Sequence, residues 1–345
     1  MVAQKRRLFL KTMVGAGAAC LNGVAGEERG GGEKSLDSKS PPETTTIRLA
    51  KVPITCVAPQ YIAEELLRNE GFTDIRYVGL EGDIGRGGVP AMIGRGRVDI
   101  SLTFGAPMLI PMDAGEPITA LAGVHVGCFE LFAREGVQGI ADLKGKSVGI
   151  PYSSSAPHTF LSIMTSYVGV DPISDVNWVI NPSARPKQLF IEGKIDAFLA
   201  FPPETQELRA KNIGRVIANS AQDHPWSQYF CCLLAANTQF VEKNPIAVKR
   251  ALRAILKSFD FCVSQPEQAA RLVTERGYAD RRDYVFQMLK ELPYDVWRDY
   301  DPEDTIRFYA LRMQELGMIK STPQKLIAEH TNWHFLNELK RELKT

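Results

Sequence analysis

The fold is decided by the stretch Gly96-Arg97-Val98-Asp99-Ile100-Ser101-Leu102-Thr103-Phe104, which recurs 97 residues later as Gly193-Lys194-Ile195-Asp196-Ala197-Phe198-Leu199-Ala200-Phe201. Both copies place a glycine, a cation, a β-branched residue and an aspartate in the same order, and both run toward a proline. The pattern predicts a helix that stops at the glycine, then a buried strand, then a loop at the carboxyl end of the strand. Two such units predict two similar α/β lobes that face each other across a cleft, as in a two-lobed binding protein.

Strand and helix signals alternate around both copies, which predicts a parallel sheet covered by helices on both faces. Besides the two copies, strands are expected at residues 47–52, 74–78, 118–124, 129–133, 147–150, 176–180, 214–219 and 229–236. Helices are expected at 59–69, 107–114, 155–168 and 186–192, and a further helix ends near 94–96. After Thr238 only helices are expected, packed on the first lobe, at 245–264, 266–276, 282–289, 302–316 and 323–343.

The composition is ordinary for a soluble globular protein, with 345 residues, 44% hydrophobic and 23% charged. The formal charge of +1 excludes a nucleic-acid binder, because no domain-wide basic field exists to displace counterions. No apolar run reaches the roughly 18–20 residues of a membrane span. A chain of this length has a soft prior of about two or three domains.

The N-terminus is expected to lie outside the fold. Lys5-Arg6-Arg7-Leu8-Phe9-Leu10-Lys11 closely resembles the twin-arginine export signal, and a Gly/Ala-rich segment follows it. We expect residues 1–25 to be a signal peptide cleaved after Ala25, and the protein to be periplasmic. Lipid attachment at Cys20 is the alternative. Residues 26–45 are rich in glycine, serine and proline and are expected to form a flexible tether.

Removal of the signal would leave an odd number of cysteines. Each lies in an apolar stretch, where a free cysteine commonly serves as a small core residue. The adjacent pair in the last strand would point to opposite faces and would not bond to each other. We therefore expect no obligatory disulfide framework among Cys56, Cys128, Cys231, Cys232 and Cys262.

The backbone is expected to cross between the two lobes twice. Residues 46–130 and 233–345 form the first lobe, and residues 131–232 form the second. The crossings near 125–131 and 226–233 would make a two-strand hinge, which permits the cleft to close on a ligand.

Ligands of open parallel sheets bind outside the carboxyl ends of the strands. Four strand ends and the hinge therefore supply the candidate ligand-binding residues, which are Thr55, Tyr61, Thr103, Phe104, Gly105, His125, Tyr152, Ser153, Ser154, Ser155, Phe201 and Glu204.

Three groups among these candidates have an alternative interpretation. The serine run, between a strand and a helix, can bind an anionic or strongly polar group through hydroxyls and free amides, or it can simply cap the helix. Phe104 and Phe201, at matching places in the repeat, can hold a flat ligand between them or belong to the core. Glu204 can pair with an amine, or it can be a solvated acid at a helix start.

Enzyme signatures are thin. His330 and His334 are four residues apart, but no His-Glu-x-x-His motif exists, and Trp333 and Phe335 beside them favour packing. The glycine-rich run 82–88 lacks the Gly-Lys-Ser/Thr of a phosphate loop, and no nucleophile is paired with a base by sequence. We expect no catalytic residues, no cofactor and no metal.

Three motifs in combination resemble the substrate-binding proteins of ABC importers in the nitrate, sulfonate/taurine and thiamine-pyrimidine-precursor family. The first is Gly96-Arg97-Val98-Asp99-Ile100, which is similar to the family's Val-Asp strand. The second is Ile140-Ala141-Asp142-Leu143-Lys144-Gly145-Lys146, which looks like the opening of the second lobe. The third is Gly193-Lys194-Ile195-Asp196-Ala197 followed by Pro203.

The resemblance covers residues 47–320. It implies a type II periplasmic-binding fold with two Rossmann-like lobes, capture of a small molecule outside the cytoplasm, and delivery to an ABC permease in the membrane. We expect a monomer. The serine run favours an anion such as a sulfonate or carboxylate. The alternatives are an enzyme on the same fold, as in pyrimidine synthesis or the menaquinone pathway, and a ligand sensor.

Overall fold

The computed structural model describes residues 40–83, 85–181 and 185–344. Contacts divide the chain into Met1–Leu36 and Asp37–Thr345, and every described residue belongs to the second unit. The predicted signal peptide, Cys20 and most of the predicted tether therefore lie outside the described residues. Within the described part, no helix combines the length and apolar character needed to cross a bilayer.

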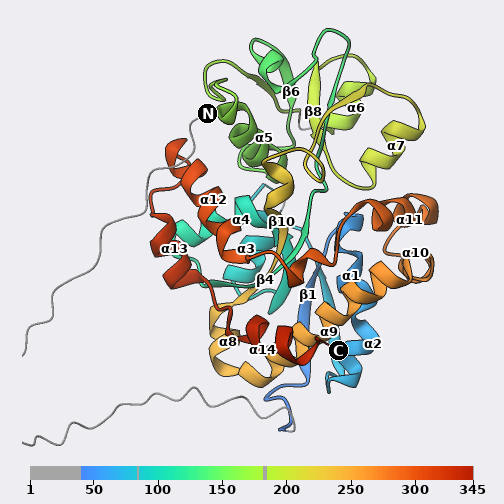
Figure 1. Ribbon diagram of the computed structural model, residues 1–345, viewed down its shortest axis with the longest axis vertical. Helices are drawn as coiled ribbons and strands as arrows, with labels where there is room; N and C mark the ends of the chain where they lie inside the picture. The colour runs from blue at the N-terminus through green and yellow to red at the C-terminus, as the bar shows by residue number, and fades with distance from the viewer. Residues whose placement is uncertain (1–39, 84, 182–184, 345) are drawn as a thin grey trace, which may run out of the picture. The chain divides into compact units, whose positions relative to one another are not determined.

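The first lobe holds two small sheets (Figure 1). Strands β1 and β2 pair in parallel, whereas β10 lies between β3 and β4 and is antiparallel to both. The strands are β1 (Thr46–Lys51), β2 (Asp74–Gly79), β3 (Ile100–Phe104), β4 (Ile118–Val126) and β10 (Phe230–Asn237). Around them lie η1 (Thr55–Val57), α1 (Ala58–Ile62), α2 (Glu64–Asn69), α3 (Gly88–Gly94), α4 (Gly105–Asp113) and α8 (Thr238–Lys243). Strands β4 and β10 are buried along their whole length and form the centre of this lobe.

The second lobe holds one five-stranded sheet in the order β7-β6-β8-β5-β9. Its strands are β5 (Glu130–Ala133), β6 (Ser147–Gly149), β7 (Asn177–Val179), β8 (Ala197–Ala200) and β9 (Arg215–Asn219). The helices are η2 (Ile140–Leu143), α5 (Ala156–Tyr167), α6 (Pro186–Ile191) and α7 (Glu204–Ala210). Phe132, Phe190 and Phe198 pack together with Leu189, Ile195 and Leu208 as the core under α6 and α7.

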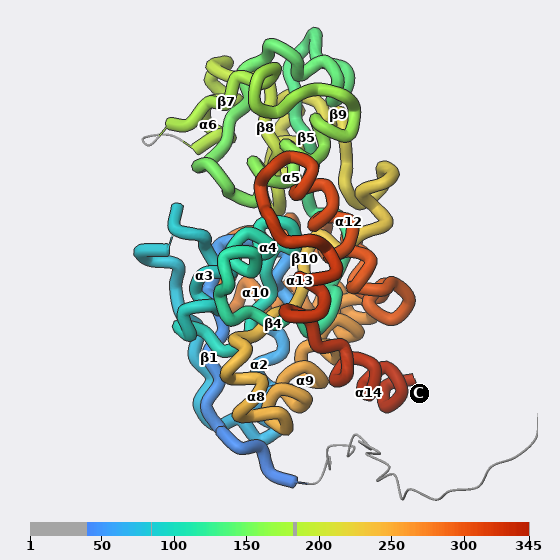
Figure 2. The backbone as a smooth tube through the Cα atoms, turned by 90° about the vertical axis from the view of Figure 1, so that its left-hand side faces the viewer, coloured from blue at the N-terminus to red at the C-terminus, as the bar shows by residue number. Residues whose placement is uncertain are grey.

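Two segments cross between the lobes, which lie one above the other in Figure 2. One joins β4 to β5 at residues 127–129, and the other joins β9 to β10 at residues 220–229 and contains η3 (Trp226–Gln228). They are bound to each other, because Phe129 donates its N–H to Ser220 Oγ at 3.0 Å and Ser220 donates its N–H to the Phe129 carbonyl at 2.9 Å. The crossings therefore form a paired two-strand hinge.

The sheets are mixed, whereas the alternation of strands and helices predicted a parallel sheet. The correction has a topological cause. Strand β5 enters the second lobe from the first, and β10 returns in the opposite direction. Each runs antiparallel to the strands that it joins.

The repeat folds alike in both lobes. Gly96 and Gly193 adopt φ of +66° and +77° and end α3 and α6. In each copy the glycine N–H bonds three residues back, and the following cation, Arg97 or Lys194, bonds five residues back, as in a Schellman motif. The predicted glycine stop is confirmed.

The helices after β10 are α9 (Pro245–Ser264), α10 (Pro266–Glu275), α11 (Arg282–Glu291), η4 (Val296–Arg298), α12 (Pro302–Glu315), α13 (Pro323–His330) and α14 (His334–Glu342). The single helix predicted at 323–343 is wrong. Residues 331–333 leave the helix because Thr331 forms a bridge to Ala120 of β4, and Asn332 donates its N–H to the Ala120 carbonyl at 3.0 Å. Helix α12 also reaches the second lobe, where Tyr309 contacts Phe160 edge to face.

Candidate functional site

The loops after β1 and β8 meet at the boundary between the lobes. Thr55 donates its N–H to the Pro202 carbonyl at 3.3 Å, so the two strand ends touch across the cleft. The Oγ1 atom of Thr55 is buried and has no hydrogen-bond partner. A buried hydroxyl without a partner is uncommon and marks a place where a ligand can bind.

Beside Thr55 lies a groove of about 420 Å³ between the lobes. The first lobe contributes the loop after β1 and the loop between α10 and α11, and the second lobe contributes α6 and α7. The lining residues are Pro53, Thr55, Lys187, Pro203, Glu207, Lys211, Gly277, Tyr278, Ala279, Asp280, Arg281 and Tyr284. Three cations and two carboxylates line the groove, but Arg281 also pairs with Asp283 at 2.6 Å, so the excess positive charge lies at the two lysines.

The two lysines of the groove share one carboxylate. Lys187 and Lys211 each approach Glu207 to 2.6 Å, and their hydrogen bonds hold the pKa of Glu207 below its usual value. A carboxylate or sulfonate in the groove would meet cations that are already held in place.

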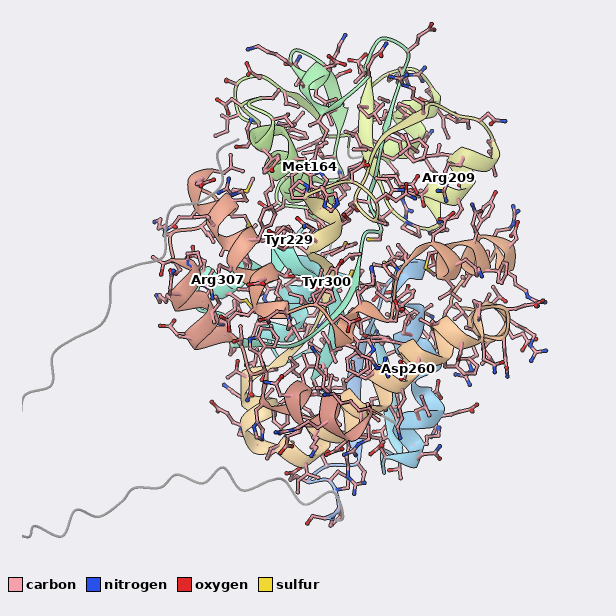
Figure 3. All side chains as sticks on the ribbon, viewed as in Figure 1. Met164, Arg209, Tyr229, Asp260, Tyr300 and Arg307 are labelled. Carbon is pink, nitrogen blue, oxygen red and sulfur yellow. The ribbon has the colours of Figure 1, made fainter. Side chains whose placement is uncertain are left out.

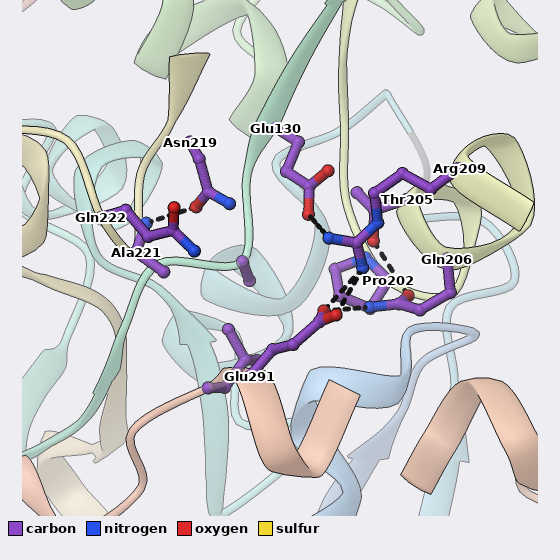
Figure 4. A pocket seen from close by; sticks show the side chains of 11 residues that line it. Glu130, Pro202, Thr205, Gln206, Arg209, Asn219, Ala221, Gln222 and Glu291 are labelled. Atoms are coloured by element: carbon purple, nitrogen blue, oxygen red, sulfur yellow. Dashed lines mark hydrogen bonds and ion pairs between the residues drawn. The ribbon is translucent and has the colours of Figure 1, made fainter. Parts of the chain in front are cut away.

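A smaller cavity of about 60 Å³ lies nearer the hinge (Figure 4). Arg209 of α7 reaches Glu130 of β5 at 3.0 Å and Glu291 of α11 at 2.6 Å, so one guanidinium joins both lobes. Gln206 also donates to Glu291, at 3.1 Å. Burial raises the pKa of Glu130 to about 7, although Arg209 opposes the shift.

The phenylalanines predicted at matching places touch each other. Phe104 and Phe201 meet at 6.0 Å between ring centroids, edge to face. Phe129 from the hinge stacks on Phe104 at 5.0 Å and on Phe160 of α5 at 5.0 Å. In this arrangement the rings form an aromatic contact between the lobes and do not lie parallel on either side of a slot.

The serine run is divided between a capping residue and exposed residues. Ser155 is buried and accepts the His158 N–H as the N-cap of α5, at 3.4 Å. Ser153 and Ser154 are exposed, and Ser154 adopts φ of +66° and donates its N–H to His158 Nδ1. Tyr152 is half-buried, and its hydroxyl faces Gly88 of the first lobe across the boundary.

Four further candidates have structural roles. Tyr61 is 1% exposed, with its hydroxyl bonded to the backbone of Val52. Thr103 is buried within β3, and Gly105 begins α4 against Leu233. His125 is fully buried, with Nδ1 3.0 Å from the Val126 carbonyl oxygen.

Glu204 begins α7 and is half-buried beside Pro203. Burial raises its pKa, and the nearby Lys187 and Arg185 oppose the shift. It does not line either of the two cavities described here.

The described cysteines all carry free thiols and are buried. Three of them, Cys56, Cys128 and Cys232, bring their Sγ atoms within 4.8 Å of one another, and this cluster is the place among the described residues where a metal ion can bind. Sequence reasoning treated the cysteines as separate core residues.

Sequence reasoning also missed the ion pairs at the lobe boundary. Glu130 carried the clearest signal, because it is an acid at the start of an apolar strand. Arg209, Lys187 and Lys211 resemble the solvated cations of any helix, and only the tertiary structure brings them to the cleft.

The NMT1/THI5-like family model matches residues 78–269 of the chain. A Brucella abortus protein named as a candidate binding protein is 25% identical over 183 residues, which cover 53% of this chain and 56% of that protein. A Saccharomyces cerevisiae protein, 4-amino-5-hydroxymethyl-2-methylpyrimidine phosphate synthase THI12, is 27% identical over 61% of this chain and 67% of its own. The chain thus spans little more than half the length of the first of these relatives.

Two solved structures share the periplasmic-binding fold. The periplasmic nitrate-binding protein NrtA from Synechocystis has a TM-score of 0.74 at 16% identity, with 88% of this chain and 90% of that chain covered. The aliphatic sulphonate-binding protein SsuA from Escherichia coli has a TM-score of 0.64 at 17% identity, with 81% and 90% covered. At these identities the likeness establishes the fold and not the ligand.

Proposed function

The chain belongs to the NMT1/THI5-like family, and we propose that it is an extracytoplasmic solute-binding protein. It captures a small polar or anionic organic molecule between its lobes and delivers the molecule to an ABC permease. The observation that carries this proposal is the groove of about 420 Å³, lined by residues of both lobes that include Thr55, whose buried hydroxyl has no hydrogen-bond partner.

The hinge gives the groove a way to open. Among residues 40–83, 85–181 and 185–344, the backbone passes between the lobes only at 127–129 and 220–229. Changes of backbone dihedrals in these two short segments can separate the lobes without unfolding either of them. A solute that contacts both lobes then favours the closed state, because it binds that state more tightly.

The charge of the groove favours an anion. Lys187 and Lys211 share the one carboxylate of Glu207, which leaves an excess positive charge at that end of the groove. A sulfonate or carboxylate accepts hydrogen bonds from lysine and from a threonine hydroxyl, and charge-assisted bonds of this kind are stronger than neutral ones.

Three further expectations belong to the proposal. The Arg6-Arg7 signal would send the protein to the periplasm, and we expect a monomer there. We also propose the lobe bounds of 46–130 with 233–345 and of 131–232, adjusted at the hinge because β5 begins at Glu130 and β10 begins at Phe230.

A thermal-shift screen of the full chain tests the proposal. The panel contains sulfonates, nitrate, carboxylates, pyrimidines and flavins. We expect one class of anion to raise the melting temperature, because a ligand that binds only the folded state stabilises it. A response to pyrimidines or flavins alone would contradict an anion-binding groove.

The variant Thr55→Val locates the site. It replaces a buried, unpartnered hydroxyl with a methyl group, so the protein without solute keeps or gains stability, while solute binding weakens by about 0.5–1.5 kcal/mol. Thr159→Val is the matched control. Thr159 Oγ1 is also buried and unpartnered, but it lies in α5 and lines neither cavity. Equal affinity in both variants would exclude Thr55 from the site.

An enzyme on the same fold is the second candidate, favoured by the 27% identity to a protein named as a pyrimidine phosphate synthase. A ligand sensor is a third. Incubation of the protein with a solute that binds, followed by mass spectrometry of solute and protein, separates the enzyme from the other two, because only an enzyme changes the solute.

A further inference from the structure

Three thiols from distant parts of the sequence meet at the hinge. Cys56 lies in η1 at the end of β1, Cys128 lies in the first crossing, and Cys232 lies in β10 directly after the second crossing. Their Sγ atoms are all within 4.8 Å of one another, and all three residues are buried. Cys231 brings a fourth sulfur within 3.0 Å of Cys128.

The spacing of these sulfur atoms fits one metal ion. A Zn–S bond of about 2.3 Å puts two thiolates on the same ion about 3.8–4.0 Å apart. The three sulfurs therefore need to move by less than about 1 Å to share an ion. The cluster also has an approach from outside, because Cys128 lines the cavity of about 60 Å³ between the lobes.

The surrounding residues hold the cluster in a way that packing alone does not require. Cys128 adopts φ of +86°, a conformation that L-residues rarely adopt and that is concentrated at functional sites. Tyr294 donates its hydroxyl to the Cys56 carbonyl at 2.8 Å and contacts the His125 ring edge to face. His125 Nε2 is buried without a hydrogen-bond partner.

From these observations we infer that Cys56, Cys128 and Cys232 bind a thiophilic metal ion, of the class of zinc or copper(I), at the hinge between the lobes. Thiolate ligands select these ions over magnesium, calcium or manganese. Each thiol loses its proton to solvent as its bond to the metal forms. Because Cys56 follows β1, Cys128 lies in the first crossing and Cys232 lies in β10, the bound ion holds the loop after β1 and the first crossing to the central strand of the first lobe. This inference does not depend on the identity of the solute.

His125 is a candidate for the fourth ligand of the ion. His125 of β4 is the cross-strand neighbour of Cys232 of β10, and its Nε2 is buried without a hydrogen-bond partner. A divalent ion beside three buried thiolates leaves a net charge of −1, which a neutral imidazole does not increase. The variant His125→Gln distinguishes three protein ligands from four by its effect on zinc affinity.

Metal titration of the full chain tests the inference. The protein is reduced, freed of metal and of reductant under anaerobic conditions, and then titrated with zinc against a chromophoric chelator and, separately, with copper(I) against bicinchoninate. We expect about one ion per chain with at least one of the two metals. Cys56→Ser and Cys232→Ser should each weaken binding by at least about tenfold.

Cys262→Ser is the matched control, because Cys262 is also a buried free thiol but lies in α9 outside the cluster. It should bind metal like the unchanged protein. If Cys56→Ser and Cys262→Ser bind equally well, or if the reduced protein binds neither metal, the inference is wrong.

A second measurement needs no variant and remains decisive if a substitution prevents folding. The unchanged protein is alkylated with and without one equivalent of metal, and each cysteine is mapped by mass spectrometry. Metal should protect Cys56, Cys128 and Cys232 but not Cys262. Equal alkylation in both samples, or a Cys128–Cys231 disulfide in place of bound metal, overturns the inference.

Discussion

Arg209 of α7 donates hydrogen bonds to both carboxylate oxygens of Glu291 in α11, at 2.8 and 2.6 Å, and so ties the second lobe to the C-terminal helices of the first. The same guanidinium contacts Glu130, which stands where the chain leaves the hinge. One cation therefore links the hinge, the second lobe and α11. The ion pairs stabilise the observed arrangement of the two lobes.

The first prediction concerns this link. Arg209→Met keeps an unbranched apolar side chain but leaves Glu130 and Glu291 without their cation, and we expect a loss of about 1–3 kcal/mol in unfolding free energy. Small-angle X-ray scattering should also show a larger radius of gyration as the lobes separate.

Arg307→Met is the control. Arg307 pairs with Glu303 along the exposed side of α12, on the other side of the view from Arg209 (Figure 3), and its loss should cost less than about 0.5 kcal/mol. An unchanged radius in Arg209→Met would show that the pair does not hold the cleft closed.

The second prediction concerns pH. Burial raises the pKa of Glu130 from 4.5 to about 7, so the folded protein holds this proton more tightly than the unfolded chain. The stability that results is fully present below pH 4.5 and is lost as the pH rises from 4.5 through 7. Unfolding free energy should therefore fall between pH 5 and pH 8 by about 1–3 kcal/mol from this group, and Glu130→Gln should remove that fall.

Glu207→Gln is the comparison for the pH experiment. Its lysine partners hold the pKa of Glu207 below 4.5, so its contribution is present above that pH and is lost only at lower pH. Denaturant unfolding at pH 5 and pH 8 should show the same fall in unfolding free energy in Glu207→Gln as in the unchanged protein. If Glu130→Gln also shows that fall in unfolding free energy, Glu130 does not titrate between pH 5 and pH 8.

The secondary structure of the repeat could be predicted from the sequence, because a glycine after a helix and an apolar run before a proline are local signals. The role of its aspartates was not readable. Asp99 accepts the Arg48 N–H at 2.7 Å, and Asp196 accepts the Ser147 N–H at 2.8 Å. In each lobe the aspartate therefore binds the backbone of another strand. Those partners are about fifty residues away, and nothing local identifies them.

The third prediction follows from Asp196. Its bonds to the Ser147 hydroxyl and N–H hold its pKa below the usual value. Asp196→Ala leaves both donors without an acceptor, and we expect a loss of about 1–3 kcal/mol in unfolding free energy. Glu329→Ala, an exposed acid on α13, should change stability by less than about 0.5 kcal/mol. Equal stability of the two variants would mean that water replaces the aspartate at β6.

Most of the candidate site depended on contacts that a sequence does not display. The serines and Phe201 were proposed because they follow strands. Phe201 contacts Phe104 of the other lobe, whereas Ser153, Ser154 and Ser155 line neither of the two cavities described here. The thiol cluster was missed because Cys56, Cys128 and Cys232 are far apart in the sequence, and only the tertiary structure brings their sulfurs together. The predicted helix through 331–333 failed for the same reason, because the edge of β4 binds that backbone and no local pattern records it.

The fourth prediction concerns the close approach of the two crossings. Gly127 adopts φ of +78°, and a Cβ there would collide with Ala221 of the other crossing. Gly127→Ala therefore combines backbone strain with a steric clash between the two halves of the hinge, and we expect a loss of about 2–4 kcal/mol in unfolding free energy. Gly139→Ala is the control, because φ at Gly139 is −156° and open space surrounds the position. That variant should stay within about 1 kcal/mol of the unchanged protein. Thermal and denaturant unfolding measure both effects.

A clash that spreads the crossings should also weaken solute binding more than the fall in stability accounts for, because the closed state needs the crossings paired. Normal stability and affinity in Gly127→Ala would mean that the crossings can move apart without cost and that other contacts position the lobes.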